Sequence, residues 1–205
     1  MNVSVKGKLF FVLLALTLML GTTVISSAQA PAGVPVFEVT PVQSKISFDV
    51  DASVEIEGTF KKWDATLTMT SPDATTAVLN IKIDAASVDT GSGMKNSKLK
   101  SDDFFDVKKN PYITFKSTKV VQTGPTTFEV DGDFTIRGVT RQEKLKLTMY
   151  GKGTGSGSVE GTMAFDRKDY GMNSGIPFIK IANRVQVTIN IKAKRVSGPP
   201  VVFKQ

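Results

Sequence analysis

The sequence predicts an all-β fold made of antiparallel strands. Hydrophobic and polar residues alternate with a period of two in many short runs, as in residues 46–50 and 185–192, and such alternation is typical of half-buried strands. Each run has one apolar and one polar face, as in antiparallel sheets with one wet side. No long segment of residues 29–205 shows the period of a helix, which excludes architectures that alternate strands with helices.

The alternating runs divide the chain into about eight or nine short strands. They are, in order, residues 46–50, 63–69, 79–83, 113–116, 128–130, 134–137, 145–149, 159–165 and 185–192. Residues typical of turns separate several of them, at 71–73, 123–125, 131–133 and the glycine-rich 151–157. This pattern alone leaves two architectures open, a sandwich and a closed barrel. Closure would remove exposed strand edges, and an eight-stranded barrel has room for its own side chains or one slim ligand.

The N-terminus has the three-part layout of a secretory signal peptide. Lys6 and Lys8 precede an apolar run at 9–20, and small or polar residues follow at 21–30. The apolar run is short for a membrane-spanning helix, which needs about 20 residues. We therefore expect residues 1–28 to be a signal peptide. Cleavage after Ala30 is the alternative, disfavoured by the proline that follows.

Four segments follow from this division of the chain. They are the signal peptide at 1–28, a flexible N-terminal segment at 29–35, one β domain at 36–196 and a C-terminal tail at 197–205. Export through the signal peptide predicts a periplasmic location. The chain contains no cysteine, so the hydrophobic core must hold the fold without disulfides.

The composition argues against catalysis. The chain contains neither histidine nor cysteine, which excludes Ser-His-Asp and Cys-His nucleophilic systems and removes the commonest metal ligand. The remaining carboxylate candidates have simpler interpretations. Asp49 and Asp51 lie on a solvent-facing parity, Asp102 and Asp103 fit the start of a helical turn, and residues 131–133 fit a hairpin turn. We predict no catalytic residue, no metal site and no cofactor.

The net charge is +7, or about +5 without the two lysines of the signal peptide. The lysines are scattered, and no run of five like charges occurs. Because nucleic-acid binding requires a clustered basic patch, we expect no nucleic-acid partner. A scattered positive surface favours solubility and transient contact with anionic lipid headgroups at a membrane surface.

One segment, Met94 to Asp106, breaks the alternation. Ser101 is positioned to cap a short helical turn through Phe105. We expect a long loop with one or two short helical turns that lies as a lid over a barrel opening.

Four motifs give a family resemblance. KNSKLKSDDFFDVKKNPYITFKST (95–118), GDFTIRGVTR (132–141), DRKDYG (166–171) and the IDAASVDTG element (83–91) occur in order. Together they resemble the signatures of the YceI-like family, and with the strands between them they cover about residues 36–195. The resemblance implies an eight-stranded antiparallel lipocalin-like barrel that holds a polyisoprenoid chain in its lumen. It also implies export to the periplasm, no catalytic residues and, in many relatives, a homodimer.

The lid departs from the family pattern at three positions. Lys95, Asn96 and Lys98 stand where the family has Arg, Asp and His. An Arg–Asp ion pair is thereby lost with its bidentate geometry, and two lysines at the mouth favour an anionic headgroup. The identity of the headgroup therefore stays open.

We predict a lumen that binds an apolar lipid without specific polar chemistry, since each buried CH₂ is worth about 0.8 kcal/mol. The predicted wall residues are Phe48, Leu67, Leu79, Ile81, Phe115, Phe134, Ile136, Leu147, Phe165, Val187 and Ile189. The predicted lid and mouth residues are Lys95, Asn96, Lys98, Leu99, Phe104 and Phe105. Three ligand hypotheses remain open: a polyprenyl or quinone lipid, a fatty acid or fatty amide, and no ligand at all in a filled structural or stress-response barrel.

Overall fold

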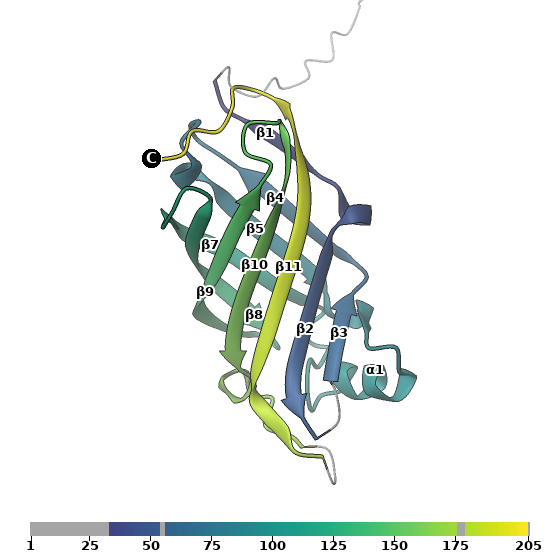
Figure 1. Cartoon of the computed structure of the whole chain (residues 1–205). Helices are drawn as coiled ribbons and strands as arrows, with labels where there is room; N and C mark the ends of the chain where they lie inside the picture. Colours follow the sequence, from purple (N-terminus) through teal and green to yellow (C-terminus); the bar gives the residue numbers. More distant parts are fainter. Residues whose placement is uncertain (1–32, 54–55, 176–178, 205) are drawn as a thin grey trace, which may run out of the picture.

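A computed structural model describes residues 33–53, 56–175 and 179–204. The predicted signal peptide and residues 29–32 lie outside these ranges. The described chain forms one antiparallel sheet that curls into an elongated barrel, with one α-helix at one end (Figure 1). The prediction of an all-β, antiparallel, lipocalin-like fold with a short helical lid is confirmed.

The sheet has eleven strands, so the prediction of eight is wrong. The strands are β1 (Val36–Val39), β2 (Lys45–Ala52), β3 (Ile56–Phe60), β4 (Trp63–Thr68), β5 (Val78–Asp84), β6 (Val88–Asp89), β7 (Tyr112–Gln122), β8 (Thr127–Ile136), β9 (Val139–Tyr150), β10 (Ser156–Asp166) and β11 (Ile181–Ser197). The additional strands are short: β1, β3 and β6 have four, five and two residues. So short a run carries little alternation, and its pairing depends on neighbours distant in sequence.

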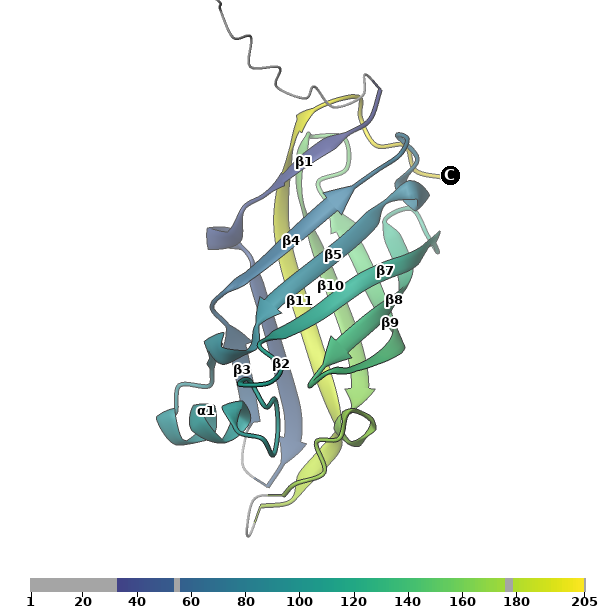
Figure 2. The ribbon, with the colours of Figure 1, turned by 180° about the vertical axis from the view of Figure 1, so that it is seen from behind.

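The strands follow the order β4-β5-β7-β8-β9-β10-β11-β2-β3-β6, and β1 pairs with the last part of β11. β1 also runs beside β4, the strand at one end of this order (Figure 2). The long strand β11 therefore pairs with β10 and β2 along most of its length and with β1 near its end. These pairings bring both ends of the curled sheet around one interior.

One predicted turn lies instead within strand β8. Residues 131–133 continue this strand, where we predicted a hairpin turn, because Gly132 faces inward beneath an aromatic ring. A Cβ atom at position 132 would lie 2.5 Å from the Phe115 ring, so the glycine permits a close approach that a larger residue would obstruct. The turn lies instead at Arg137 and Gly138, whose φ angles of 54° and 75° fit a two-residue hairpin.

The lid begins earlier than predicted. Helix α1 (Gly93–Lys100) starts at Ser92, whose side chain accepts a hydrogen bond from the Lys95 N–H. Ser101 ends this helix, and its hydroxyl donates to the Lys98 carbonyl, so the prediction that its side chain caps a following turn is wrong. A hydrogen-bonded turn does follow, because the Phe104 N–H donates to the Ser101 carbonyl. The sequence signal was weak because the helix has only two large hydrophobic residues, Met94 and Leu99, and they form no apolar stripe.

Candidate binding site

The barrel interior holds two apolar cavities. The first, which we call the lid chamber, has a volume of about 110 Å³ and lies next to α1. The second, the tail chamber, has a volume of about 150 Å³ and lies toward the C-terminal end of β11. Both cavities have walls made mainly of hydrophobic side chains, which is the usual composition of a lipid or small-molecule site.

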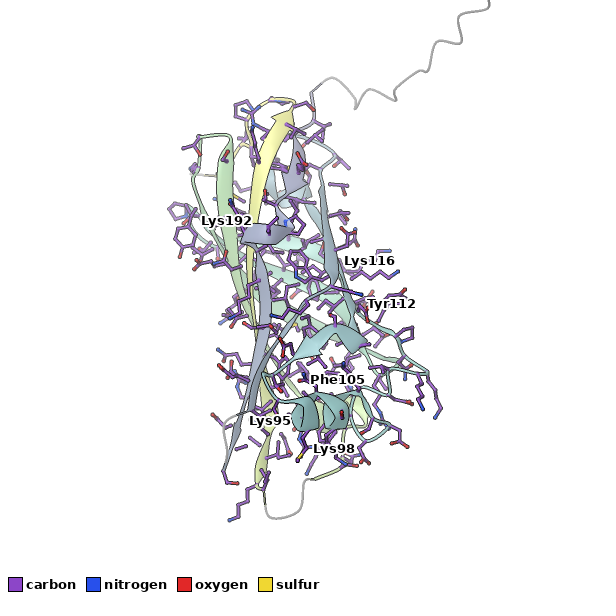
Figure 3. All side chains as sticks on the ribbon, turned by 90° about the vertical axis from the view of Figure 1, so that its right-hand side faces the viewer. Lys95, Lys98, Phe105, Tyr112, Lys116 and Lys192 are labelled. Atoms are coloured by element: carbon purple, nitrogen blue, oxygen red, sulfur yellow. The ribbon has the colours of Figure 1, made fainter. Side chains whose placement is uncertain are left out.

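Aromatic rings dominate the lid chamber. Phe48, Phe60 and Phe105 pack with ring centroids 5.6 to 6.4 Å apart. Phe105 comes from the lid and points into the barrel above α1 (Figure 3). On the opposite wall Phe134 and Phe165 lie 5.1 Å apart. Such contacts stabilise packing beyond the area they bury, so this chamber is continuous with the hydrophobic core.

The tail chamber is lined mainly by aliphatic residues. Its wall includes Leu67, Leu79, Val130, Leu147 and Ile189. Its rim is formed by the glycine-rich loop at 151–157 and by residues near the C-terminus. The loop is the hairpin tip that the sequence predicted, since it joins β9 to β10. A role in lining a cavity had no signal in the sequence.

A constriction, which we call the waist, separates the two chambers. Ile81, Phe115, Leu145 and Met163 are buried in the core but line neither cavity. Ile81, Phe115 and Met163 each lie on their strand between a residue of one chamber and a residue of the other, as Ile81 does between Leu79 and Ile83, and Leu145 precedes Leu147 of the tail chamber. The ring of Phe115 lies over Gly132 at this level, so rotation of one side chain changes the width of the passage.

The structure places all predicted wall residues at the interior. Phe48, Phe134, Ile136, Phe165 and Val187 line the lid chamber. Leu67, Leu79, Leu147 and Ile189 line the tail chamber. Ile81 and Phe115 form part of the waist.

Of the predicted lid residues, five line the lid chamber and one does not. Lys95, Lys98, Leu99, Phe104 and Phe105 border the cavity. Figure 3 shows Lys95 and Lys98 on α1 at this end of the barrel. Asn96 has a structural contact instead.

The Asn96 side chain joins the lid to the segment that precedes it. Its Oδ1 accepts hydrogen bonds from the Thr90 N–H and the Thr90 hydroxyl, each 2.8 Å long. Its amide also lies next to Asp89, where it helps to lower the pKa of that carboxyl, after the larger effects of the Gly91 N–H and Lys61. An amide side chain can accept hydrogen bonds from Thr90 and donate one to Asp89. A carboxylate at this position would instead place a second negative charge beside Asp89.

A polar network ties the lid to the opposite loops. Lys98 donates to Asp103, and the Ser174 hydroxyl donates to the other oxygen of Asp103 over 2.7 Å. Lys98 and Ser174 therefore hold the pKa of Asp103 below its usual range. Arg137 donates to the carbonyls of Asp102 and Gly171 and so fastens the lid to two further loops. Asp102 and Asp103 thus lie in the turn that follows the helix, and they also anchor the lid to the opposite loops.

Arg167 is a buried cation at the wall of the lid chamber, and the sequence analysis missed it as a site residue. Its side chain is 6% exposed and donates to the carbonyls of Met172, Ser174 and Ala182. Within the described ranges no carboxylate forms an ion pair with it. The DRKDYG motif was the available signal, although the motif alone did not show which way the arginine points.

Tyr170 closes the wall behind Arg167. Its ring contacts Phe134 and Phe165 with centroids 5.5 and 5.2 Å away, and its hydroxyl donates to Glu143 over 2.7 Å. Burial, followed by the hydrogen bond to Glu143, raises the pKa of Tyr170 well above its usual range. The tyrosine therefore stays neutral and acts as a structural residue.

The C-terminal residues 199–204, which we call the C-terminal strap, cross the open end of the tail chamber. The Val202 N–H donates to Pro72, and the side chain of Gln122 exchanges hydrogen bonds with the main chain of Lys204. Phe203 lines the cavity with its ring 6.1 Å from that of Phe128. A few hydrogen bonds and one ring contact therefore attach the strap to the barrel.

The acidic side chains of the described residues form no cluster suited to hold a metal ion. None of the helices in the described ranges is both long and apolar enough to cross a membrane.

Comparison with known proteins places these features in a family context. Residues 37–193 match the family model described as the YceI-like domain. A UPF0312 protein of Pseudomonas savastanoi pv. phaseolicola is 31% identical over 167 residues, covering 78% of this chain and 87% of the relative. A UPF0312 protein of Azotobacter vinelandii is 27% identical over 168 residues, covering 78% and 86%.

Solved structures of similar proteins have the same fold as this chain. The crystal structure of Burkholderia cenocepacia BcnA matches with a TM-score of 0.69 and 26% identity, over 76% of this chain and 99% of BcnA. The Campylobacter jejuni YCEI protein matches with a TM-score of 0.58 and 26% identity, over 68% and 85%. A polyisoprenoid binding domain from Saccharophagus degradans matches with a TM-score of 0.60 over 78% and 99%. Its identity is 13%, so it shows a shared fold.

Proposed function

Since this chain belongs to the YceI-like family, we propose that it binds one long isoprenoid lipid, of the polyprenyl or quinone type, along its lumen. The observation that carries the proposal is the pair of apolar chambers in line, separated only by apolar side chains at the waist. The neighbour from Saccharophagus degradans, described as a polyisoprenoid binding domain, supports the same ligand class. We further propose export to the periplasm, where such a tail could not cross water unaided.

The length of the lumen favours a long chain. From Val185 in the lid chamber to Arg195 in the tail chamber, β11 covers about 33 Å at ~3.3 Å per residue. With the ~40° tilt usual in barrels, this corresponds to ~25 Å along the axis. A membrane acyl chain covers one leaflet, about half of a ~30 Å hydrocarbon core. A fatty acid would therefore fill one chamber, and a longer isoprenoid is needed to occupy both.

The chambers as they stand are small for such a ligand. Volumes of about 110 and 150 Å³ lie below the 300 to 1,000 Å³ that is usual for ligand sites. We propose that the lipid joins them by displacing the ring of Phe115 and flexible side chains of the waist such as Met163. Methionine side chains adapt to irregular space at modest cost, and the Phe115 ring would move to another rotamer.

The polar end of the ligand is expected in the lid chamber. The polar side chains that border this cavity are the cations Lys95, Lys98 and Arg167. Cations favour a carbonyl, carboxylate or phosphate group and disfavour a second cation. This same observation keeps a fatty acid or fatty amide as the second candidate, with its head in the lid chamber and its tail ending near the waist.

Solvent extraction of the purified protein, followed by mass spectrometry, tests the proposal. We expect an isoprenoid whose mass fits repeated five-carbon units. An extracted fatty acid or amide would support the second candidate. A protein that carries no lipid and takes up none on incubation would contradict both, and would favour a barrel filled by its own side chains.

A variant in the tail chamber, next to the waist, distinguishes the two ligand lengths. Gly161 faces inward on β10, and a Cβ atom there would lie 2.5 Å from Leu147 and 2.7 Å from Ile189. Gly161→Leu should push the side chains of Leu147 and Ile189 into the tail chamber, abolish retention of a long isoprenoid and leave binding of a short acyl chain in the lid chamber. The matched control is Thr162→Leu, which places the same side chain on the exposed face of the same strand.

We propose a binding function without catalysis, and a homodimer as in many relatives. Light scattering of the purified protein tests the second point, since a monomeric mass would contradict it. Expression of the complete chain, followed by cell fractionation and N-terminal sequencing, tests export and cleavage after Ala28.

A further inference from the structure

Exposed apolar residues gather around the mouth of the tail chamber. Val121, Tyr150, Val196 and Val202 are between 38% and 59% exposed. Hydrogen bonds tie their neighbours together: Gln122 to Lys204, the Val202 N–H to Pro72, and the Arg195 N–H to Gly155. These four side chains therefore lie around one rim. Exposed apolar residues in a group often mark an interaction surface, so the rim is a candidate for one.

Basic residues surround the same rim. The segments at 33–38, 69–77, 119–126, 149–157 and 193–204 form this end of the barrel and hold five basic residues against two acidic ones. The basic residues are Lys119, Lys152, Lys194, Arg195 and Lys204. Glu38 pairs in register with Lys194, and the carboxylate of Asp73 accepts two hydrogen bonds from Thr75 in its own turn.

The lid end of the barrel differs in its charge pattern. Residues 93–110 hold five lysines but also Asp102, Asp103 and Asp106. Two of these aspartates form ion pairs, with Lys98 and with Lys109. Residues 93–110 thus carry a net charge of +2 with two of their lysines in ion pairs, whereas the rim segments carry a net charge of +3 together with the four exposed apolar side chains.

We infer that the rim of the tail chamber is a docking surface for an anionic lipid bilayer. Lysines near an anionic surface are attracted to it, and tyrosine and valine side chains can enter the headgroup region beside them. A polyanion such as nucleic acid would use the lysines alone and would not require the apolar residues. The inference deepens the proposed function, because docking would place the mouth of the lumen against the membrane that holds the lipid.

The C-terminal strap connects docking to access. The ammonium group of Lys152 lies 4.7 Å above the ring of Phe203, which closes the chamber. A phosphate group of the bilayer competes with this ring for the same cation. Docking would therefore weaken one contact that holds the strap over the mouth.

Co-sedimentation with vesicles tests the docking surface. Vesicles of phosphatidylcholine with a quarter of phosphatidylglycerol contain no isoprenoid, so the result does not depend on what the lumen binds. We expect binding to these vesicles, none to pure phosphatidylcholine, and release at high salt, because a ~3 Å screening length at 1 M removes the attraction.

Paired variants locate the surface. Lys152→Gln with Lys204→Gln should weaken binding about 25-fold, at roughly 5-fold per lysine. Lys108→Gln with Lys109→Gln removes the same charge at the lid end and should change binding less than 3-fold. Tyr150→Ser with Val202→Ser keeps the charge and should also weaken binding. Equal effects of the two lysine pairs, or no effect of the apolar pair, would overturn the inference.

Discussion

The two chambers of the lumen are held together by different means. The lid chamber is surrounded by a cluster of aromatic rings and closed by a polar network that joins Lys98, Asp103 and Ser174. The tail chamber is surrounded by aliphatic side chains and closed by the C-terminal strap, through a few main-chain hydrogen bonds and the ring of Phe203. The lid end of the barrel is therefore part of the hydrophobic core, whereas the tail end is closed by a segment that few contacts hold.

This difference assigns separate tasks to the two ends. Buried aromatic contacts and hydrogen bonds from several loops fix the geometry of the lid chamber, which suits recognition of a headgroup. Few contacts hold the strap, and regions with few buried contacts open at low free-energy cost. We therefore expect the lipid to enter and leave through the tail chamber.

The largest predicted effect tests whether the lid chamber belongs to the core. Phe105 is 7% exposed and contacts Phe48 and Phe60. Phe105→Ala should lower the free energy of unfolding by about 3 to 5 kcal/mol, as for other buried phenylalanines. Phe203→Ala, in the strap, should lower it by about 1 kcal/mol or less. Denaturant unfolding measures both, and similar losses would contradict the distinction between the two ends.

A smaller effect is expected where the lid meets the preceding segment. Asn96→Ala removes the acceptor of two hydrogen bonds from Thr90, and each typically contributes about 0.5 to 1.5 kcal/mol. We expect a loss of ~1 to 3 kcal/mol in the free energy of unfolding. Asn96→Asp keeps an acceptor and is the matched control. It should retain the bonds to Thr90 but raise the pKa of Asp89, measured by NMR titration. An alanine variant as stable as the wild type would contradict this role.

The smallest effect is the response of the lid to acid. Lys98 and Ser174 lower the pKa of Asp103 in the folded state, so its contribution is fully present above the unfolded value near ~3.9 and is lost as the pH falls through the lower folded value. Hydrogen exchange at the amides of α1 should accelerate only below about pH 4. In Asp103→Asn this acceleration should disappear, and an unchanged pH dependence in that variant would assign it to another group.

The sequence predicted the interior better than the ends. Strand parity placed Phe134, Leu147 and Ile189 toward the lumen, because an inward position recurs at every second residue of a strand whatever the order of the strands. Parity could not show that Ile81 and Phe115 form a waist. A constriction depends on which strands are neighbours and on the ring of Phe115 lying over Gly132, seventeen residues later in the sequence.

The closures of the barrel were harder to predict for a similar reason. The strap has no alternation, and its position depends on contacts of Lys204 with Gln122 and of Val202 with Pro72. The lid was recognised as an interruption of the strand pattern, but its helix begins at Ser92, and Arg167 reaches its chamber from a distant turn. Pairwise contacts between remote segments leave no periodic signal in the chain.

Binding of a series of polyprenols of increasing length, measured by calorimetry or fluorescence displacement, tests the central claim most directly. If one chain occupies both chambers, affinity should continue to rise as isoprene units are added beyond the length that fills the lid chamber. In Gly161→Leu the rise should stop at the waist. An affinity that reaches its maximum at a length confined to one chamber, in the wild type as in the variant, would contradict a continuous lumen for a long isoprenoid.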